Sequence, residues 1–350
     1  MPSLHKVATG HCGFVGAMGS CVEYSPVGAS AGRHRLLASA RSVTRCCCAP
    51  SEAHQKRIRG FHGCCSAPST LTNRAALMDL IEMQKWAYMP DLPDDIGPVR
   101  DLLRAYSKIP IDEIDNHILR VRELAWGISR YPCVGRWRFL RLNDSHDPCH
   151  RQVVFRLSVA GSRDVFLDLG CCVGQVLRQL RAAGVQGSQL IGTDVQAKFI
   201  DIGYSLFRDR ERLGASFVVG DMLDPDDDRL EGLRGRVTIV YAGSFFHLFS
   251  WTQQLYIGKR LVAFLKPGTR NALIYGRHIG TTKPGGEAPT TTMPAYLHDK
   301  NSFQRLWDEI GFLTKTRWKV QVEATGDAAL VPSRLGRNSH PVNFTVYQIS

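Results

Sequence analysis

The feature that most limits the fold is an alternation of short apolar runs and amphipathic segments, which begins near Arg151 and continues almost to the end of the chain. The amphipathic segments repeat apolar residues at spacings of three and four, which is the pattern of a helix. Strands that alternate with such helices form a mostly parallel sheet covered by helices on both faces. The predicted strands are VFLDLG (165–170), QLIGTDV (189–195), SFVVGDML (216–223), VTIVYAG (237–243) and NALIYGRHIG (271–280).

The C-terminal part predicts one addition to this sheet. TRWKVQVEA (316–324) and VNFTVYQIS (342–350) alternate apolar and polar residues, and a long loop divides them. They predict an antiparallel hairpin at the sheet edge, so residues 151–350 are predicted to form an α/β, Rossmann-like domain. Its predicted helices are QVVFRLSVA (152–160), QVLRQLRAAG (175–184), KFIDIGYSLFRDRERLG (198–214, ended by Gly214), QQLYIGKRLVAFLKPG (253–268) and NSFQRLWDEIG (301–311).

Residues 76–150 are predicted to form a helical cap in front of this domain. Three amphipathic helices are expected there, followed by an aromatic and basic loop over residues 131–150. The expected helices are LMDLIEMQKWAYM (77–89), PVRDLLRAYSKI (98–109) and IDEIDNHILRVRELAWGIS (111–129), the last with Ile111, Ile114, Ile118, Val121 and Ala125 on one face.

The N-terminal 75 residues differ in composition from the rest. They hold nine of the 44 Lys and Arg residues, two of the 32 Asp and Glu residues and seven of the 11 cysteines. This bias resembles an organellar transit peptide, and it also fits a misread gene start ahead of Met78. We expect a disordered or non-native extension that is dispensable for activity.

The remaining chain excludes several classes of function. Without residues 1–75 its formal charge falls from +12 to +5, and it has no basic stripe with interleaved aromatics, so nucleic acid is not an expected partner. No apolar run approaches the roughly 20 residues of a membrane helix, so we expect a cytoplasmic protein without stable membrane insertion. No cysteine pair has zinc spacing, so no metal is expected.

The segment DVFLDLGCCVGQ (164–175) is the predicted cofactor loop, because ligands of open parallel sheets bind beyond the carboxyl ends of the strands. A dinucleotide loop would read GxGxxG, and the frame from Gly170 keeps only one of the three glycines. Redox sensing by the vicinal cysteines is an alternative, but such cysteines cannot easily pair with each other. Small apolar filling beside a cofactor is the favoured role.

Acidic residues at the ends of the first three strands indicate which cofactor the loop takes. Gly170 and Gly174 let the backbone turn tightly after Asp168. Asp194 is placed to accept both ribose hydroxyls, and Asp221 to accept from an adenine amino group. No lysine suited to a phosphate follows the loop. A ligand with adenosine and a positive charge but no phosphate fits these surrounding carboxylates, and S-adenosylmethionine is such a ligand.

From Ser162 onward these motifs resemble the class I S-adenosylmethionine-dependent methyltransferases, with Cys172 at the middle glycine of their usual D/E-x-G-x-G-x-G loop. Over residues 76–350 the chain resembles, more closely, the fungal methyltransferases of meroterpenoid biosynthesis. The segments that carry this resemblance are LPDDIGPVRDLL (92–103), YSKIP (106–110), VRELAW (121–126), YPCVGRWRFL (131–140), FLDLGCCVGQ (166–175), GYSLFRDR (203–210) and SFFHLFSW (244–251).

This resemblance implies methylation of the carboxyl group of a farnesylated dimethylorsellinic-acid intermediate, with the cysteine pair as part of the family's loop. It implies that the cap and residues 131–140 close over a small, hydrophobic aromatic acid. The cofactor site it implies places Asp168, Gly170, Cys172 and Gly174 at the methionine side, Asp194 and Val195 at the ribose, and Asp221 and Met222 at the adenine.

The acceptor side is less defined by the sequence. His247 follows the fourth strand and is the candidate catalytic residue, and Arg136 and Arg138 are candidates to pair with a substrate carboxylate. A carboxylic acid is already ionised at neutral pH, so its methylation needs no obligatory base, whereas a phenol would need one. Methylation of a phenol or another acceptor and a non-catalytic regulator remain alternatives. The oligomeric state is open, with a homodimer as one option.

Overall fold

The structure is a computed structural model that describes residues 81, 85–285, 295–326, 331 and 338–349. The chain divides into two units, residues 1–65 and 66–350, and every described residue lies in the second unit. The predicted extension over residues 1–75 lies outside the described residues, as does most of the predicted helix over 77–89. The described residues 85–87 of that helix are helical.

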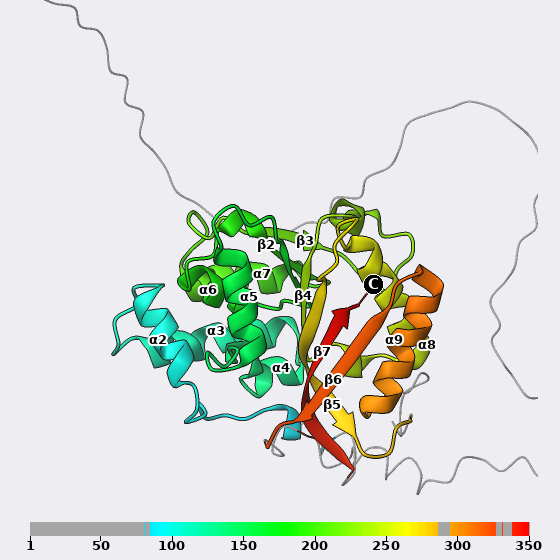
Figure 1. Ribbon diagram of the computed structural model, residues 1–350. Coiled ribbons are helices and arrows are strands. Elements are labelled where there is room, and N and C mark those ends of the chain that lie inside the picture. The colour runs from blue at the N-terminus through cyan, green and yellow to red at the C-terminus, as the bar shows by residue number, and fades with distance from the viewer. Residues whose placement is uncertain (1–80, 82–84, 286–294, 327–330, 332–337, 350) are drawn as a thin grey trace, which may run out of the picture. The chain divides into compact units, whose positions relative to one another are not determined.

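A seven-stranded sheet forms the centre of the described unit and confirms the predicted Rossmann-like class I methyltransferase fold (Figure 1). Its strand order is β3-β2-β1-β4-β5-β7-β6. The first five strands pair in parallel, and β7 is antiparallel to both of its neighbours. The bounds are β1 Phe166–Leu169, β2 Leu190–Asp194, β3 Ser216–Val219, β4 Ile239–Gly243, β5 Leu273–Thr281, β6 Trp318–Ala324 and β7 Ser339–Gln348.

The predicted C-terminal hairpin is confirmed, with β6 at the outer edge of the sheet. The last strand of the chain does not extend the edge, however. β7 lies between β5 and β6 and pairs with β5 from Leu273↔Tyr347 to Thr281↔Ser339. Because β5 is parallel to β4, this insertion lets the antiparallel strand bring its first residues, Pro341 and Asn343, to the edge where the parallel strands end.

Helices cover both faces of the sheet, as the alternating sequence pattern predicts (Figure 1). One apolar core joins one face to α8 and α9, and another joins the opposite face to α5 and α6. Capping boxes begin both α8, at Ser250, and α9, at Asp299. The bounds are α5 Pro148–Ser158, α6 Gln175–Ala182, α7 Ala197–Phe207, α8 Trp251–Phe264 and α9 Lys300–Thr314.

Helix α7 ends earlier than its sequence predicts. The predicted helix continues to Gly214, but α7 ends at Phe207 and Arg208 adopts a left-handed backbone conformation. This early end turns Asp209 inward, where its carboxylate accepts two hydrogen bonds of 3.0 Å from the guanidinium of Arg178, and both side chains are fully buried. A tertiary ion pair thus overrides the local helical pattern.

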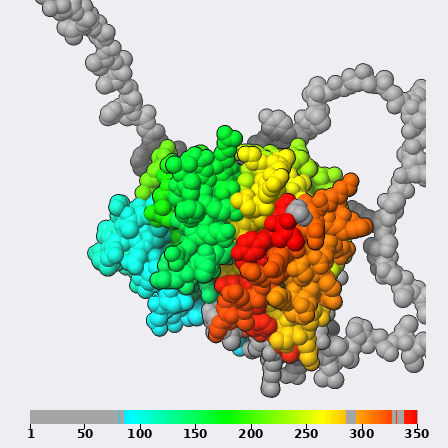
Figure 2. All heavy atoms as spheres, in the orientation of Figure 1, coloured from blue at the N-terminus to red at the C-terminus, as the bar shows by residue number. Residues whose placement is uncertain are grey.

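The cap helices pack on the main domain through a shared apolar core. Buried cap residues such as Leu103 and Ile118 lie in one cluster with Phe199 and Leu206 of α7, and in Figure 2 the cap (cyan) lies directly against the following chain (green). Ile111 does not belong to the buried face, because it precedes α3 and is 71% exposed. The cap elements are α2 Gly97–Ala105, α3 Ile114–Ile128, α4 Pro132–Gly135 and the 3-10 turn η1 Arg138–Leu140.

Candidate active site

A pocket lies at the edge of the sheet where the parallel strands β1, β4 and β5 end. The enclosed cavity is only about 70 Å³. Ligand pockets usually measure hundreds of Å³, so the lining must open to admit a cofactor and an acceptor together. The lining includes Cys133, Arg138 and Arg141 of the cap, Asp168 of β1 with Gly170 and Cys172 after it, Tyr241 and Gly243 of β4 with Ser244 after it, and Arg277 and His278 of β5.

Asp168 is the buried acid of this pocket. Its carboxyl is 3% exposed, and no described residue donates a hydrogen bond to it. Burial raises the pKa of Asp168 to about 8, the charge of Asp194 adds to the effect, and Arg277 and Arg178 oppose it. A buried carboxyl without a cationic partner is suited to a ligand that brings one, as the amino group of a bound amino acid would.

The loop after β1 is held to the end of β2 by Asp194. One carboxylate oxygen accepts from the backbone N–H of Cys172 at 2.8 Å, and the other accepts from Gln196 at 2.9 Å. Cys172 has a φ of 51°, in the left-handed region that favours glycine, and Gly170 and Gly174 share this region. The cysteine Cβ is therefore accommodated at some conformational cost. The Cys172 thiol forms a hydrogen bond with the free thiol of Cys133 in the cap.

Arg178 supports the cofactor loop from behind. Besides its ion pair with Asp209, its guanidinium donates to the carbonyl oxygens of Val173 at 3.0 Å and Gly174 at 3.3 Å. A Cβ on Gly174 would lie 2.6 Å from this guanidinium, so the position excludes larger residues. The phenol of Tyr106 in the cap donates to the same Asp209 carboxylate at 2.9 Å. One buried network thus fixes the cofactor loop and the cap together.

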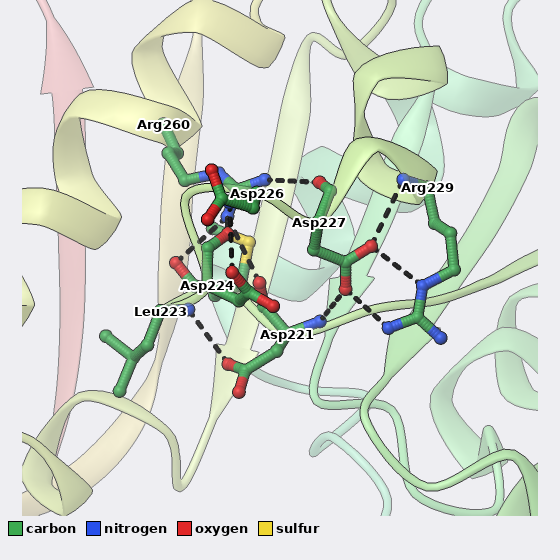
Figure 3. A network of polar contacts seen from close by, with 8 residues as sticks. Asp221, Leu223, Asp224, Asp226, Asp227, Arg229 and Arg260 are labelled. Carbon is green, nitrogen blue, oxygen red and sulfur yellow. Dashed lines mark hydrogen bonds and ion pairs between the residues drawn. The ribbon is translucent and has the colours of Figure 1, made fainter. Parts of the chain in front are cut away.

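The loop after β3 is held by two arginines (Figure 3). Arg260 of α8 donates to the carbonyl oxygens of Asp221, Met222 and Asp224 at 2.8–3.3 Å, and of Asp227 at 3.4 Å. Asp227 binds Arg229 through both carboxylate oxygens and accepts from the N–H of Asp221 at 2.7 Å. The Arg229 hydrogen bonds hold the pKa of Asp227 well below its usual range. These contacts fix the backbone around Asp221 and Met222 before any ligand binds.

The residues predicted for the cofactor fall on three consecutive loops at one edge of the sheet. Asp168 lies near the end of β1 and Gly170, Cys172 and Gly174 follow it, Asp194 ends β2 and Val195 follows it, and Asp221 and Met222 follow β3. The Val195 side chain is 66% exposed and Met222 is buried. The unpartnered carboxyl of Asp168 and the positive φ of Gly170 fit a cationic ligand lying close to this backbone, as S-adenosylmethionine would.

The structure separates the residues predicted for the acceptor. Arg138 lines the pocket, whereas Arg136 donates to the carbonyl of Trp86 at 2.8 Å and lies over its ring at 4.7 Å. His247 lies in a 3-10 turn, η4 Phe246–Leu248, and is not among the residues that line the pocket. Burial lowers the pKa of His247 to about 3, with a contribution from Arg138, so the imidazole is neutral and weakly basic at neutral pH.

The sequence prediction missed Arg277 and His278. Both lie in the middle of β5, at the level where the neighbouring β4 ends (Gly243↔Arg277), and both line the pocket. Arg277 donates to the carbonyl of Arg141 in the cap at 3.2 Å. Their sequence signal is weak but present, because GRHIG places two polar residues inside an otherwise apolar strand. The rule that directed attention to the residues after β1 to β3 applies equally to β5.

Other features of the described residues do not compete with this site. A shallow hollow of about 520 Å³ lies at the opposite end of the strands, around Phe155 and Lys266, where this sheet type does not bind ligands. No group of three His, Cys, Asp or Glu side chains in the described part of the chain is placed to hold a metal. No helix in the same part is long and apolar enough to cross a membrane.

Sequence comparisons agree with this geometry. The profile of the family described as "Meroterpenoid methyltransferase N-terminal domain" matches residues 87–140, which are the cap, and that of a "Methyltransferase domain" matches residues 166–268. O-methyltransferase phiE from Fungal sp. (strain ATCC 74256) is 36% identical over 69% of this chain and 83% of its own length. The chain belongs to this family of fungal methyltransferases.

A second curated relative supports the same membership. The Asnovolin E/Chermesin D methyltransferase nvfJ of Aspergillus novofumigatus is 34% identical over 68% of this chain and 85% of its own length. Among solved structures, a SAM-dependent methyltransferase from Aquifex aeolicus is 14% identical over 58% of this chain and 90% of that chain, with a TM-score of 0.38. The protein is therefore an S-adenosylmethionine-dependent methyltransferase related to enzymes of fungal meroterpenoid pathways.

Proposed function

We propose that this methyltransferase esterifies the carboxyl group of a prenylated aromatic acid in fungal meroterpenoid biosynthesis. The observation that carries the proposal is the charge of the pocket. Arg138, Arg141 and Arg277 line it together with Asp168, whose raised pKa of about 8 leaves its carboxyl mostly protonated at neutral pH. A cationic lining favours an anionic acceptor, and an aromatic carboxylate is such an acceptor.

The basicity of nearby histidines favours a carboxylate over a phenol. Burial lowers the pKa of His247 to about 3 and that of His278 well below its usual value. Neither imidazole is a good base for a phenol, whose pKa is near 10, whereas a carboxylate is ionised without help. Catalysis then rests on positioning the carboxylate and excluding water.

The cofactor side supplies the rest of the proposal. Asp168 would hold the amino group of the methionine moiety, Asp194 the ribose hydroxyls, and the fixed backbone around Asp221 and Met222 the adenine. When bound, S-adenosylmethionine supplies an electrophilic methyl group on a positively charged sulfur. The cap residues Cys133 and Arg138 lie against the opening of this pocket, and their movement would admit the acceptor and then close over it.

The test uses the full-length chain, labelled S-adenosylmethionine and three matched acceptors: a prenylated aromatic acid with a free phenol, its phenol methyl ether, and its decarboxylated phenol. We expect both acids to be labelled, with products that release the label under alkaline hydrolysis. The decarboxylated phenol should stay unlabelled. Alkali-stable label on that phenol would contradict the proposal and show a phenol or carbon acceptor.

A pair of variants tests the role of the arginines. Arg138→Gln should raise KM for the acid roughly 10-fold or more, because a hydrogen bond to a charged group is lost, while affinity for S-adenosylmethionine stays within about two-fold. Arg104→Gln removes the same charge from an exposed position of the cap, where Arg104 pairs only with Asp101 among the described residues. If both variants behave alike, the pocket arginine does not bind the acid.

A further inference from the structure

His278 is a buried polar side chain of the pocket that makes no hydrogen bond to the described residues. It is 4% exposed, it lines the pocket, and neither ring nitrogen has a hydrogen-bond partner among the described residues. Its ring stacks on Phe344 with centroids 4.8 Å apart and meets the edge of Phe303 at 5.1 Å. A phenylalanine would suit these apolar neighbours better than a histidine does.

A second buried histidine in the same aromatic cluster shows how the fold treats such a ring when its role is structural. His298 also contacts Phe303, and both of its nitrogens are satisfied. Its Nδ1 lies 3.1 Å from Ser302 Oγ, and its Nε2 lies 3.1 Å from Gln254 Oε1. Buried polar groups are normally paired in this way, so an unpaired imidazole that lines a pocket indicates a missing ligand group.

We infer that the imidazole of His278 donates a hydrogen bond to an oxygen of the acceptor and thereby positions it for methylation. The inference rests on the proposed function, under which this oxygen is the carboxylate oxygen that is not methylated. His278 follows Arg277 in β5, and Arg277 pairs with Gly243, the last residue of β4. Because consecutive strand residues point to opposite faces, Arg277 would supply a charge and His278 a directed donor from opposite faces of the sheet to a carboxylate beyond the end of β4.

The protonation state of His278 agrees with a donor role and not with base catalysis. Burial lowers its pKa well below the usual value, and the neighbouring imidazoles of His247 and His298 act in the same direction. A neutral imidazole offers one N–H donor. In the transfer, the other carboxylate oxygen forms the bond to the methyl carbon, the sulfur–methyl bond breaks with its electron pair going to sulfur, and His278 keeps its proton.

His278→Phe and His278→Asn in the full-length enzyme separate a positioning role from a structural one. Phe fills the aromatic cluster without a donor, and Asn keeps an N–H near the position of Nδ1. We expect His278→Phe to retain its thermal midpoint and to bind S-adenosylmethionine within two-fold of wild type. Its kcat/KM for the acid should fall roughly 10- to 100-fold, the range for losing a hydrogen bond to a charged group. His278→Asn should recover most of this loss although it packs less well.

The opposite trends of stability and activity make the result decisive. If His278→Phe keeps full kcat/KM, or if activity follows the thermal midpoint so that Asn is worse than Phe, the inference is overturned. Failure of the proposed function gives a different result, because wild-type enzyme would then methylate a phenol or carbon instead of the acid. With that acceptor, the kcat/KM values of His278→Phe and His278→Asn relative to wild type still decide whether His278 binds the acceptor oxygen.

Discussion

The cofactor side and the acceptor side of this pocket are built in different ways. On the cofactor side, carboxylates and backbone are already held: Asp194 accepts two backbone N–H groups, and Arg260 donates to four carbonyl oxygens. On the acceptor side, described polar groups stand without partners, among them the His278 nitrogens and the Tyr241 hydroxyl. The first half is fixed before binding, and the second is completed by what binds.

The strongest test of the fixed half is Asp194→Ala. This substitution removes the proposed ribose ligand and also frees the N–H of Cys172, so we expect affinity for S-adenosylmethionine to fall at least about 100-fold. Equilibrium dialysis measures it directly. Asp201→Ala is the matched control, because that exposed acid lies on α7 and pairs with Arg210. Affinity retained in Asp194→Ala would show that this carboxylate does not bind the ribose.

Asp168 should make both the ligand-free stability of the protein and its affinity for S-adenosylmethionine depend on pH. Its pKa is about 8 in the folded, ligand-free protein and about 4 in an unfolded chain, so ligand-free stability should decrease as pH rises from 4 to 8. A cationic ligand favours the ionised carboxyl. Affinity for S-adenosylmethionine should therefore rise by up to about 10-fold per pH unit below pH 8 and level off above it.

Asp168→Asn is the control for this titration, because it keeps the size of the side chain and removes its charge. Calorimetric titration of both proteins between pH 6 and 9 separates the contribution of Asp168 from the ligand's own ionisation. We expect weaker binding and a flatter profile in the variant, and a higher ligand-free thermal midpoint at pH 8. Equal slopes in the two proteins would contradict the assignment of Asp168 to the cationic part of the ligand.

Arg260→Met should have an intermediate effect. Its loss leaves the loop after β3 held mainly by Asp227 and Arg229, so we expect affinity for S-adenosylmethionine to fall roughly 10-fold with little change in KM for the acid. Lys259→Met removes the same charge from the neighbouring exposed position of α8 and should bind normally. A larger effect on the acid than on the cofactor would mean that the two halves are not independent.

The smallest expected effect distinguishes the two adjacent cysteines. Cys172→Gly relieves a left-handed backbone, which costs an L-residue about 1–2 kcal/mol, and this gain slightly exceeds the flexibility that glycine adds. The substitution also removes the hydrogen bond of the Cys172 thiol to Cys133, so we expect stability to be unchanged. Cys171→Gly, at a position without positive φ, removes a buried thiol and should lower stability by about 1–2 kcal/mol. Denaturant unfolding of both variants compares them, and equal losses would contradict this account.

The same contrast explains how far the sequence could be interpreted. Strand and helix spacing identified the sheet. The same spacing placed Asp168 in β1, Asp194 at the end of β2 and Asp221 shortly after β3, because each acid lies in or next to a local apolar pattern. The predicted end of α7 was wrong because the Arg178–Asp209 ion pair, which accompanies the early end of this helix, is a long-range contact that local spacing does not reveal. Arg277 and His278 were missed for a related reason: only the folded sheet shows that β4 ends beside Arg277 and that Arg277 contacts the cap.

The position of β7 has a consequence for how the chain is made. β7, which ends at Gln348, fills the place between β5 and β6, so the sheet cannot close until this late strand has been made. Until then β5 presents an unpaired edge, and such an edge can pair with another chain. Substitutions that disrupt the second half of β7 should therefore reduce the yield of native protein, although this half does not line the pocket.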